Sequence, residues 1–273
     1  MAKNLIISAF TGYRFNQLKP YVRSIEKFAS DADKVMVIGE TDQYTKHQLQ
    51  NMGWRIEDLP PFNQVPIHVL RFLPMYNYLM THANEYNLVV STDVKDVVFQ
   101  DDPFQWLEQN LKDKKLVAGS EALRYEHEPW GDENLRQTYG RYVYDIFKTN
   151  TIYNVGTLGG HADYMRDLFF NLFYNSISRP IPIVDQAVFN VLIQTLPYSD
   201  AVLFADQQAA WACQAGTVAD PQKMSYFRPN LLEPEPVWRN GEVFTSQGNK
   251  FTIVHQYDRV PTWNTHILNQ YNN

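Results

Sequence analysis

The sequence predicts an α/β protein with a mixed, mainly parallel sheet flanked by helices. Short apolar runs rich in β-branched residues, at 5–10, 35–38 and 88–90, alternate with two segments whose apolar residues recur at helical spacing, 18–28 and 68–83. A strand–helix–strand series of this kind builds a parallel sheet that helices cover. Ligands of such sheets collect beyond the carboxyl ends of the strands, so we expect a binding site there.

The first part of the chain supplies most of this sheet. Residues 5–10 form the expected first strand, and Gly12 ends it. The helix at 18–28 tolerates Pro20 because the proline lies in its first turn. The elements expected next are a strand at 35–38, a polar helix at 44–52, a short strand at 54–56, a proline loop at 60–66, a helix at 68–83 and a strand at 87–92.

The remainder of the chain has a looser pattern. We expect a strand at 114–121, a long ordered loop at 122–140, a strand ending in a glycine turn at 152–160, helices at 161–177 and 184–196, and short strands such as 251–257. A loop of 19 residues in a compact domain is typically functional, and its aromatic residues favour an ordered one.

Composition narrows the class of protein. The chain has 273 residues, 44% of them hydrophobic, which is enough for one large domain. A net charge of −6 argues against nucleic acid as a partner, since phosphate backbones need clustered cations. The one cysteine, Cys213, fits a reducing compartment. With no signal peptide and no run of about 20 apolar residues for a transmembrane segment, we expect a soluble cytoplasmic protein.

Two carboxylates follow the strand at 87–92, where its backbone leaves the core. Asp93 and Asp96 are three residues apart and lie at the carboxyl edge of the predicted sheet. Carboxylates this close repel each other, and a hard divalent cation such as Mn²⁺ or Mg²⁺ removes that cost. Such cations are often completed by substrate phosphates. The alternative is a solvated turn with capping acids, because Asp101 and Asp102 directly precede Pro103.

Four stretches, in this order, resemble motifs of nucleotide-sugar glycosyltransferases of the GT-A fold, a Rossmann-like architecture. "VVSTDVKDVVFQDDPF" (89–104) resembles the Asp-rich motif whose acids hold the cation against the donor diphosphate. "YNVGTLGG" (153–160) resembles the Asn-x-Gly turn that lines the sugar pocket. "VDQAVFN" (184–190) resembles the Asp-Gln segment of retaining members such as glycogenin. "IVHQYDR" (253–259) resembles the late strand whose histidine completes the metal site.

The resemblance implies roles for particular residues. Asp93, Asp96 and His255 would bind Mn²⁺ or Mg²⁺, and Asp185 with Gln186 would lie beside the anomeric carbon of the donor. Structural alternatives exist for two of these: an N-cap for Asp185 and a hydrogen-bonded core position for His255. The usual motif spacing is Asp-x-Asp, whereas here two residues separate the acids, so either acid could be the direct ligand.

Substrate contacts are expected from residues near the strand ends and in the long loop. The end of the first strand would contact the base and ribose, and an arginine would clamp the diphosphate. A lysine between the acids would pair with an acid or a phosphate, and the Asn-x-Gly turn would contact the sugar. A tryptophan of the long loop, near His127 and Glu128, would stack on the acceptor. These residues are Ser8, Phe10, Thr11, Tyr13, Arg71, Lys95, Asn154, Gly156, Gly160 and Trp130. Packing explains Phe10 and Trp130 as well, and a solvent-facing charge explains Arg71.

The function expected from the resemblance is sugar transfer from a nucleoside diphosphate sugar, UDP-sugar before GDP-sugar, to a glycan or glycoconjugate acceptor, with retention. Residues 1–273 would form one domain, with a nucleotide-binding half at 1–104, an acceptor and sugar half at 105–273, and a C-terminal metal and acceptor subregion. The alternatives are an inverting enzyme with Asp185 or Glu121 as general base, and a catalytically silent sugar- or nucleotide-binding protein, which Lys95 within the acid motif favours. The absence of an anchor fits a bacterial or viral type.

Overall fold

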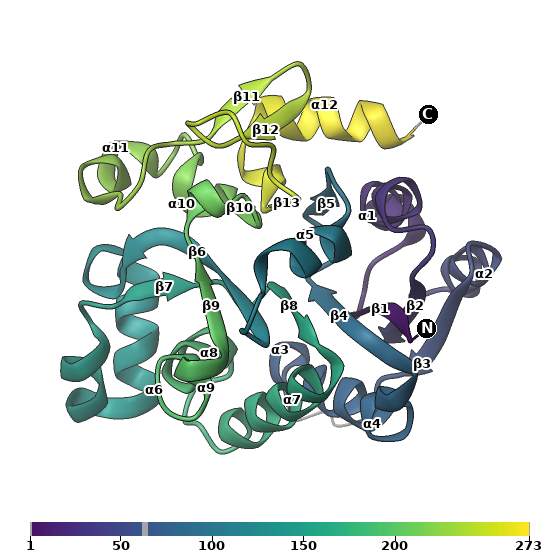
Figure 1. Cartoon of the computed structure of the whole chain (residues 1–273), viewed down its shortest axis with the longest axis horizontal. Coiled ribbons are helices and arrows are strands. Elements are labelled where there is room, and N and C mark those ends of the chain that lie inside the picture. The colour runs from purple at the N-terminus through teal and green to yellow at the C-terminus, as the bar shows by residue number, and fades with distance from the viewer. Residues whose placement is uncertain (1, 62–64, 273) are drawn as a thin grey trace.

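A mixed sheet forms the centre of the computed structural model, which describes residues 2–61 and 65–272. Within those residues its eight strands have the spatial order β3-β2-β1-β4-β8-β6-β7, with β9 paired to β6 (Figure 1). The strands are β1 Lys3–Phe10, β2 Asp33–Ile38, β3 Trp54–Asp58, β4 Tyr86–Thr92, β6 Leu116–Arg124, β7 Thr151–Tyr153, β8 Thr157–His161 and β9 Val202–Ala205. The first four are mutually parallel, and β8 is antiparallel to its neighbours β4 and β6. The predicted fold class is therefore confirmed.

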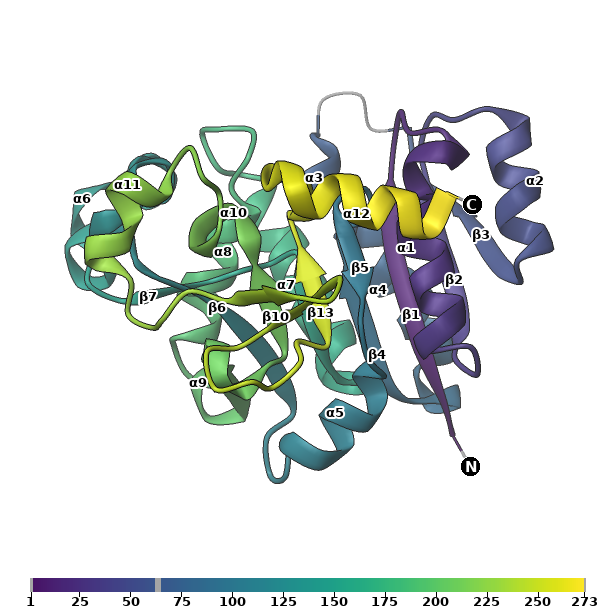
Figure 2. The same ribbon diagram turned by 90° about the horizontal axis from the view of Figure 1, so that it is seen from above.

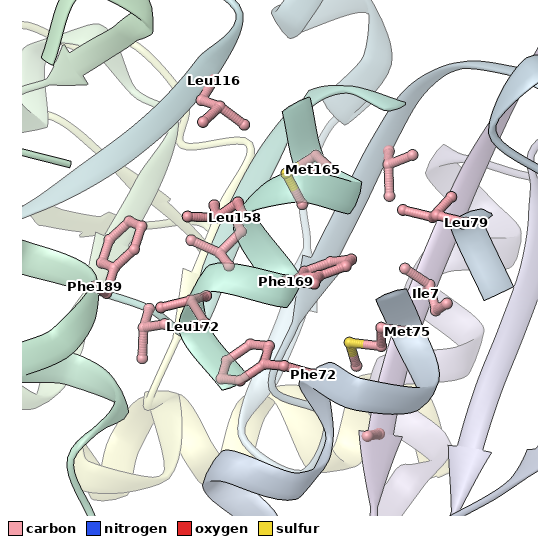
Figure 3. Packing of buried hydrophobic residues seen from close by; sticks show 14 of the residues in the cluster. Ile7, Phe72, Met75, Leu79, Leu116, Leu158, Met165, Phe169, Leu172 and Phe189 are labelled. Atoms are coloured by element: carbon pink, nitrogen blue, oxygen red, sulfur yellow. The ribbon is translucent and has the colours of Figure 1, made fainter. Parts of the chain in front are cut away.

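Helices cover both faces of this sheet, because its strands are apolar on both sides. One face packs against α1 (Phe15–Phe28) and α5 (Pro103–Asn110). The other packs against α4 (Phe72–His82) and α7 (Ala162–Ser176), where Phe72 and Phe169 stack with ring centroids 6.0 Å apart (Figure 3). The remaining helices of this part are α2 Gln43–Asn51, α3 Ile67–Leu70, α6 Pro129–Phe147, α8 Asp185–Ile193 and α9 Tyr198–Ala201.

The C-terminal part builds a smaller layer over one edge of the central sheet (Figure 1). Its strands β10 (Ala212–Gln214) and β13 (Ile253–His255) join β5 (Val97–Phe99) in a three-stranded sheet with β13 in the middle. The antiparallel register pairs Val97 with His255, so it brings the segment after the acid motif to the late histidine. The other elements are β11 Val237–Arg239, β12 Glu242–Phe244, α10 Ala215–Val218, α11 Met224–Phe227 and α12 Pro261–Asn272.

The last helix, α12, returns to the N-terminal half and packs across α1 (Figure 2). Arg23 of α1 donates to the main-chain carbonyl of Tyr271 at 2.5 Å, which ties the two helices together. Among the described residues, no helix has both the length and the apolar character that a bilayer span requires.

Two expectations about local structure are wrong. The segment 122–140 is not a loop: it continues β6, passes through a 3-10 turn at Tyr125–His127 and enters α6. Pro129 begins that helix and the Glu128 side chain caps it. The sequence therefore contains a helix start signal, but the polar residues around it favoured a loop. The glycines at the end of 152–160 form no turn but lie in β8. Position 160 needs glycine because a Cβ there would come within 2.3 Å of the Lys115 carbonyl oxygen. Residues 62–64 of the expected proline loop lie outside the described residues.

Candidate functional site

Three potential metal ligands from distant parts of the chain converge at the edge of the central sheet. Asp93 and Asp96 lie between β4 and β5, and His255 ends β13. One ligand atom from each lies within 4.8 Å of the others. The Nε2 atom of His255 is 3.4 Å from Asp93 Oδ2 and 3.9 Å from Asp96 Oδ1. We call these three residues the acid–histidine cluster.

The backbone around the cluster is held from several sides. The Asp93 N–H donates to the Gly156 carbonyl at 3.0 Å, and the Tyr257 hydroxyl donates to the Lys95 carbonyl at 3.2 Å. Gly156 forms the floor: a Cβ there would lie 2.7 Å from His255 Cε1 and 2.8 Å from Asp93 Oδ2. Glycine is required at this position because the two ligands approach its backbone so closely.

The charges of the cluster are partly compensated within the protein. Burial would raise the pKa of Asp93, but the Arg71 guanidinium and His255 hold it below the usual range. Burial raises the pKa of Asp96, which Arg71 does not contact. Burial also lowers the pKa of His255, yet the neighbouring carboxylates of Asp93 and Asp96 outweigh this and raise it. Two carboxylates and one imidazole suit Mn²⁺ or Mg²⁺, because oxygen ligands dominate and a single nitrogen is tolerated.

Two cavities meet at the cluster. The first, of about 310 Å³, runs to the end of β1 and is lined by Phe10, Thr11, Tyr13, Lys95 and Asp96, among others. The second, of about 360 Å³, lies on the opposite side and is lined by Glu121, Trp130, Asn154, Gly156, Asp185 and Gln186, among others. Arg71, Asp93 and His255 line both. Two members of the cluster, Asp93 and His255, therefore form with Arg71 a common wall of two cavities, one at the end of β1 and one between β6, β8 and α8.

Arg71 is a buried ionic bridge and not a solvent-facing charge. Its side chain is 10% exposed, and its guanidinium contacts Asp93 with Nη1 and Asp185 with Nη2, the latter at 3.0 Å. Asp185 is itself buried, which raises its pKa against the opposing effect of Arg71. Lys95 turns away from both acids of the motif and pairs with Asp258 at 3.7 Å.

Gln186 and Asn154 belong to a buried amide network. Both donate their side-chain amides to Oε1 of Glu121, at 2.6 Å and 2.7 Å. The oxygen of Gln186 accepts from the Val155 N–H at 2.9 Å. Gln186 thus cross-links α8 to the turn at 154–156, with both of its polar atoms engaged. Burial and nearby Glu128 raise the pKa of Glu121, which the sequence suggested only as an alternative base.

Two residues expected to contact substrate lie outside both cavities, and other residues line them. Ser8 is fully buried; its hydroxyl lies 2.7 Å from the Tyr21 hydroxyl and accepts from the Thr92 N–H, so it reaches neither cavity. Gly160 packs β8 against β6 and also lies away from both. Residues that line both cavities without having been proposed are His68, Gln256 and Arg259. No motif in the sequence marks His68, whereas the other two fall within "IVHQYDR".

The outer acids of the motif have structural roles. Asp102 caps α5, accepting from the Phe104 N–H at 2.8 Å, and Asp101 pairs with Lys250 at 3.6 Å. The capping alternative therefore describes this pair, but not Asp93 and Asp96.

A larger cavity, of about 840 Å³, lies elsewhere, between α4, α7 and residues 192–201. The described residues that line it include Tyr76, Phe170 and Leu196 but none of the acid–histidine cluster. Size alone therefore does not select the candidate site; the convergence of ionisable groups makes the sheet edge the candidate.

The fold matches those of two solved glycosyltransferases. A galactosyltransferase, LgtC, whose structure is a complex with donor and acceptor sugar analogues, matches with a TM-score of 0.52 and 14% identity over 98% of this chain and 96% of its own. The glycosyltransferase GlyE of Streptococcus pneumoniae TIGR4 matches with a TM-score of 0.53 and 16% identity; the match covers this entire chain but 64% of GlyE. No model of a known family and no curated protein sequence matches this chain. At these identities the likeness establishes the GT-A-type fold alone.

Proposed function

We propose that this protein is a metal-dependent glycosyltransferase that moves a hexosyl or pentosyl group from a nucleoside diphosphate sugar to a glycan or glycoconjugate, with retention of configuration. The observation that carries the proposal is the wall that the two cavities share, because residues of the acid–histidine cluster line both of them. A donor with a diphosphate at the cluster would extend its nucleoside into one cavity and its sugar into the other. The fold shared with two glycosyltransferases supports the same conclusion.

The nucleoside would occupy the cavity at the end of β1. Phe10 and Tyr13 stack there with ring centroids 6.2 Å apart, and aromatic faces of this kind bind bases. Thr11 lines the same cavity. We favour UDP-sugar over GDP-sugar as the donor, and the nucleotide-sugar screen described below distinguishes the two.

Asp93, Asp96 and His255 would hold Mn²⁺ or Mg²⁺. The cation would neutralise the donor diphosphate and so favour its departure. Arg71 and Arg259, both at the junction of the cavities, are placed to bind phosphate oxygens through their guanidinium groups.

The sugar would lie beside Asp185, with Asn154 and Gly156 at its edge and Trp130 toward the acceptor. In the transfer, the bond from the anomeric carbon to the β-phosphate breaks, a bond from an acceptor oxygen forms, and the departing diphosphate takes up the hydroxyl proton. Asp185 would stabilise the positive charge that develops at the anomeric carbon. Gln186 would act through position, because its amide already holds the turn at 154–156 in place.

Two alternatives make different predictions. In an inverting enzyme Asp185 or Glu121 would be the general base, and the anomeric configuration of the product, read by NMR, separates the two stereochemical outcomes. A catalytically silent binding protein was favoured by Lys95 between the acids. Lys95 pairs with Asp258 and not with an acid of the cluster, which argues against this alternative.

The test is a screen of UDP- and GDP-sugars for Mn²⁺-dependent hydrolysis by the wild-type protein and by Asp96→Ala. We expect the variant to lose at least about 100-fold in turnover, because a cation in such a site supplies several kcal/mol of stabilisation. Asp101→Ala is the matched control: it removes an acid five positions along the same motif, whose side chain is 53% exposed. Equal turnover in Asp96→Ala and Asp101→Ala would reject the metal assignment. If the wild-type protein hydrolyses none of these nucleotide sugars, the proposal that it is a glycosyltransferase is rejected.

A further inference from the structure

We propose that Gln214 is a positioning residue: it keeps the ring hydrogen of His255 on Nδ1, so that Nε2 presents its lone pair to the site between Asp93 and Asp96. The inference rests on the metal site of the proposed function and assigns a residue that no motif of the sequence marks.

Gln214 contacts the histidine from the neighbouring strand. The parallel register of β10 and β13 pairs Gln214 with His255, and the Oε1 atom of Gln214 lies 2.8 Å from His255 Nδ1. Both side chains are almost completely buried, at 0% and 2% exposure. A neutral imidazole carries hydrogen on one nitrogen, and an amide oxygen only accepts. The hydrogen therefore lies on Nδ1, and Nε2 is free to bind a cation.

The amide also forms a hydrogen bond at its other end. Nε2 of Gln214 donates to the Thr157 hydroxyl at 2.8 Å, and the Thr157 carbonyl accepts from the Trp211 indole at 3.0 Å. Thr157 also pairs in register with Thr92, the residue before Asp93. One buried side chain thus connects β8, the strand paired with the one that leads to Asp93, to the histidine on the other side of the cluster.

The reverse orientation of this amide would have the opposite effect. With its nitrogen toward His255, Gln214 would donate to Nδ1, and the ring hydrogen would move to Nε2. That hydrogen would point at the two carboxylates and close the site to a cation. The orientation of a single buried amide therefore decides whether the imidazole is a ligand or a hydrogen-bond donor.

The consequence is measurable as metal affinity. Losing the outer partner of a metal-binding histidine typically weakens binding by about 10–100-fold. We expect that loss in Gln214→Leu, which removes the acceptor. Gln214→Glu keeps an oxygen facing Nδ1 and should restore binding to within about threefold of wild type, since carboxylates commonly serve as such partners.

Gln100 offers a matched control. It is a buried amide directly after β5, and it bonds to the carbonyls of Val243 and Phe251 without contacting His255. Gln100→Leu should lower the melting temperature as Gln214→Leu does, because each leaves buried polar groups unpaired. It should leave Mn²⁺ affinity unchanged.

The experiment has two readouts on the full chain. Titration with Mn²⁺, followed by the electron paramagnetic resonance of the free ion, gives the affinity of each variant. Long-range ¹H–¹⁵N NMR of the metal-free wild type at a pH where His255 is neutral identifies the nitrogen that carries the hydrogen. We expect hydrogen on Nδ1 and the affinity order wild type ≈ Gln214→Glu ≈ Gln100→Leu > Gln214→Leu.

Hydrogen on Nε2 in the wild type would overturn the inference. So would Mn²⁺ affinity in a folded Gln214→Leu equal to that of Gln100→Leu. If the wild type binds no Mn²⁺, the metal proposal fails instead, and the ring spectrum still decides whether Gln214 sets the position of the hydrogen.

Discussion

Replacing Gly156 with alanine tests whether the geometry of the acid–histidine cluster governs cation binding. The backbone at this position avoids the left-handed region, so alanine is conformationally permitted, and only the space for the new methyl group is at issue. That methyl would lie 2.7 Å from His255 Cε1, 2.8 Å from Asp93 Oδ2 and 2.9 Å from Asn154 Oδ1.

The size of the effect follows from these distances. Ordinary contacts begin near 3.4 Å, so His255 must move by roughly 0.7 Å and Asp93 by nearly as much. Metal–ligand distances tolerate only about 0.2 Å. We therefore expect a loss of at least about 10-fold in Mn²⁺ affinity and about 100-fold in donor hydrolysis, the latter being the usual result of misplacing a catalytic group by about 1 Å.

Mn²⁺ titration and donor hydrolysis would be measured beside Gly159→Ala, three residues further along the chain in β8. A Cβ at Gly159 meets the Trp211 ring at 3.0 Å, so this control crowds the core and not the site. It should cost about 1–3 kcal/mol of stability and leave Mn²⁺ affinity unchanged. Wild-type Mn²⁺ affinity in a folded Gly156→Ala would refute the reasoning. It would show that the displacement of His255 and Asp93 does not affect cation binding.

Three further predictions concern the same site. Because Asp93 and Asp96 raise the pKa of His255, protons compete with the cation, and Mn²⁺ affinity measured by calorimetry should rise from about pH 6 to pH 8. Without metal, protonated His255 stabilises the fold. This stabilisation is complete below the pKa of histidine in the unfolded chain and is lost as pH rises through the pKa of His255 in the folded protein. A pH-independent affinity would contradict this. Arg71→Met leaves buried Asp185 unpaired and should cost about 3 kcal/mol in urea unfolding, whereas an unchanged midpoint and slope would show the ion pair to be energetically neutral. Asp185→Asn should lower donor hydrolysis at least about 100-fold with little change in donor affinity by calorimetry, and a variant that turns over normally would remove Asp185 from the chemistry.

The framework of the fold was predictable because local patterns agree with the tertiary structure. The strand at 5–10 and the helix at 18–28 carry their periodicity in few residues, and both exist at nearly those bounds. The helix at 129–147 was missed because its exposed surface is polar and aromatic, and its apolar contacts lie mostly with other segments, such as Ile152 and Ala187. Tertiary packing decides such a helix more than its own periodicity does.

At the site, residues whose side-chain type suggests a role, such as acids and histidines in a motif, were easier to predict than residues whose role depends only on where the fold places them. Asp93 and His255 were nominated by type and motif, and their proximity depends on the pairing of β5 with β13, which no local pattern reveals. Ser8 shows the reverse error: a polar residue at a strand end suggested a ligand contact, yet its hydroxyl satisfies buried neighbours. The partner of Lys95 could not be read from the chain either, because Asp258 lies far away in sequence.

The middle position of β13 in its small sheet has a consequence for biosynthesis. A ribosome synthesises Asp93 and Asp96 long before His255, which lies on β13. Until that late segment inserts between its two neighbours, a nascent molecule carries the carboxylates without the third ligand. A polypeptide that stops before residue 253 would therefore lack both the middle strand of this sheet and one of the three potential ligands.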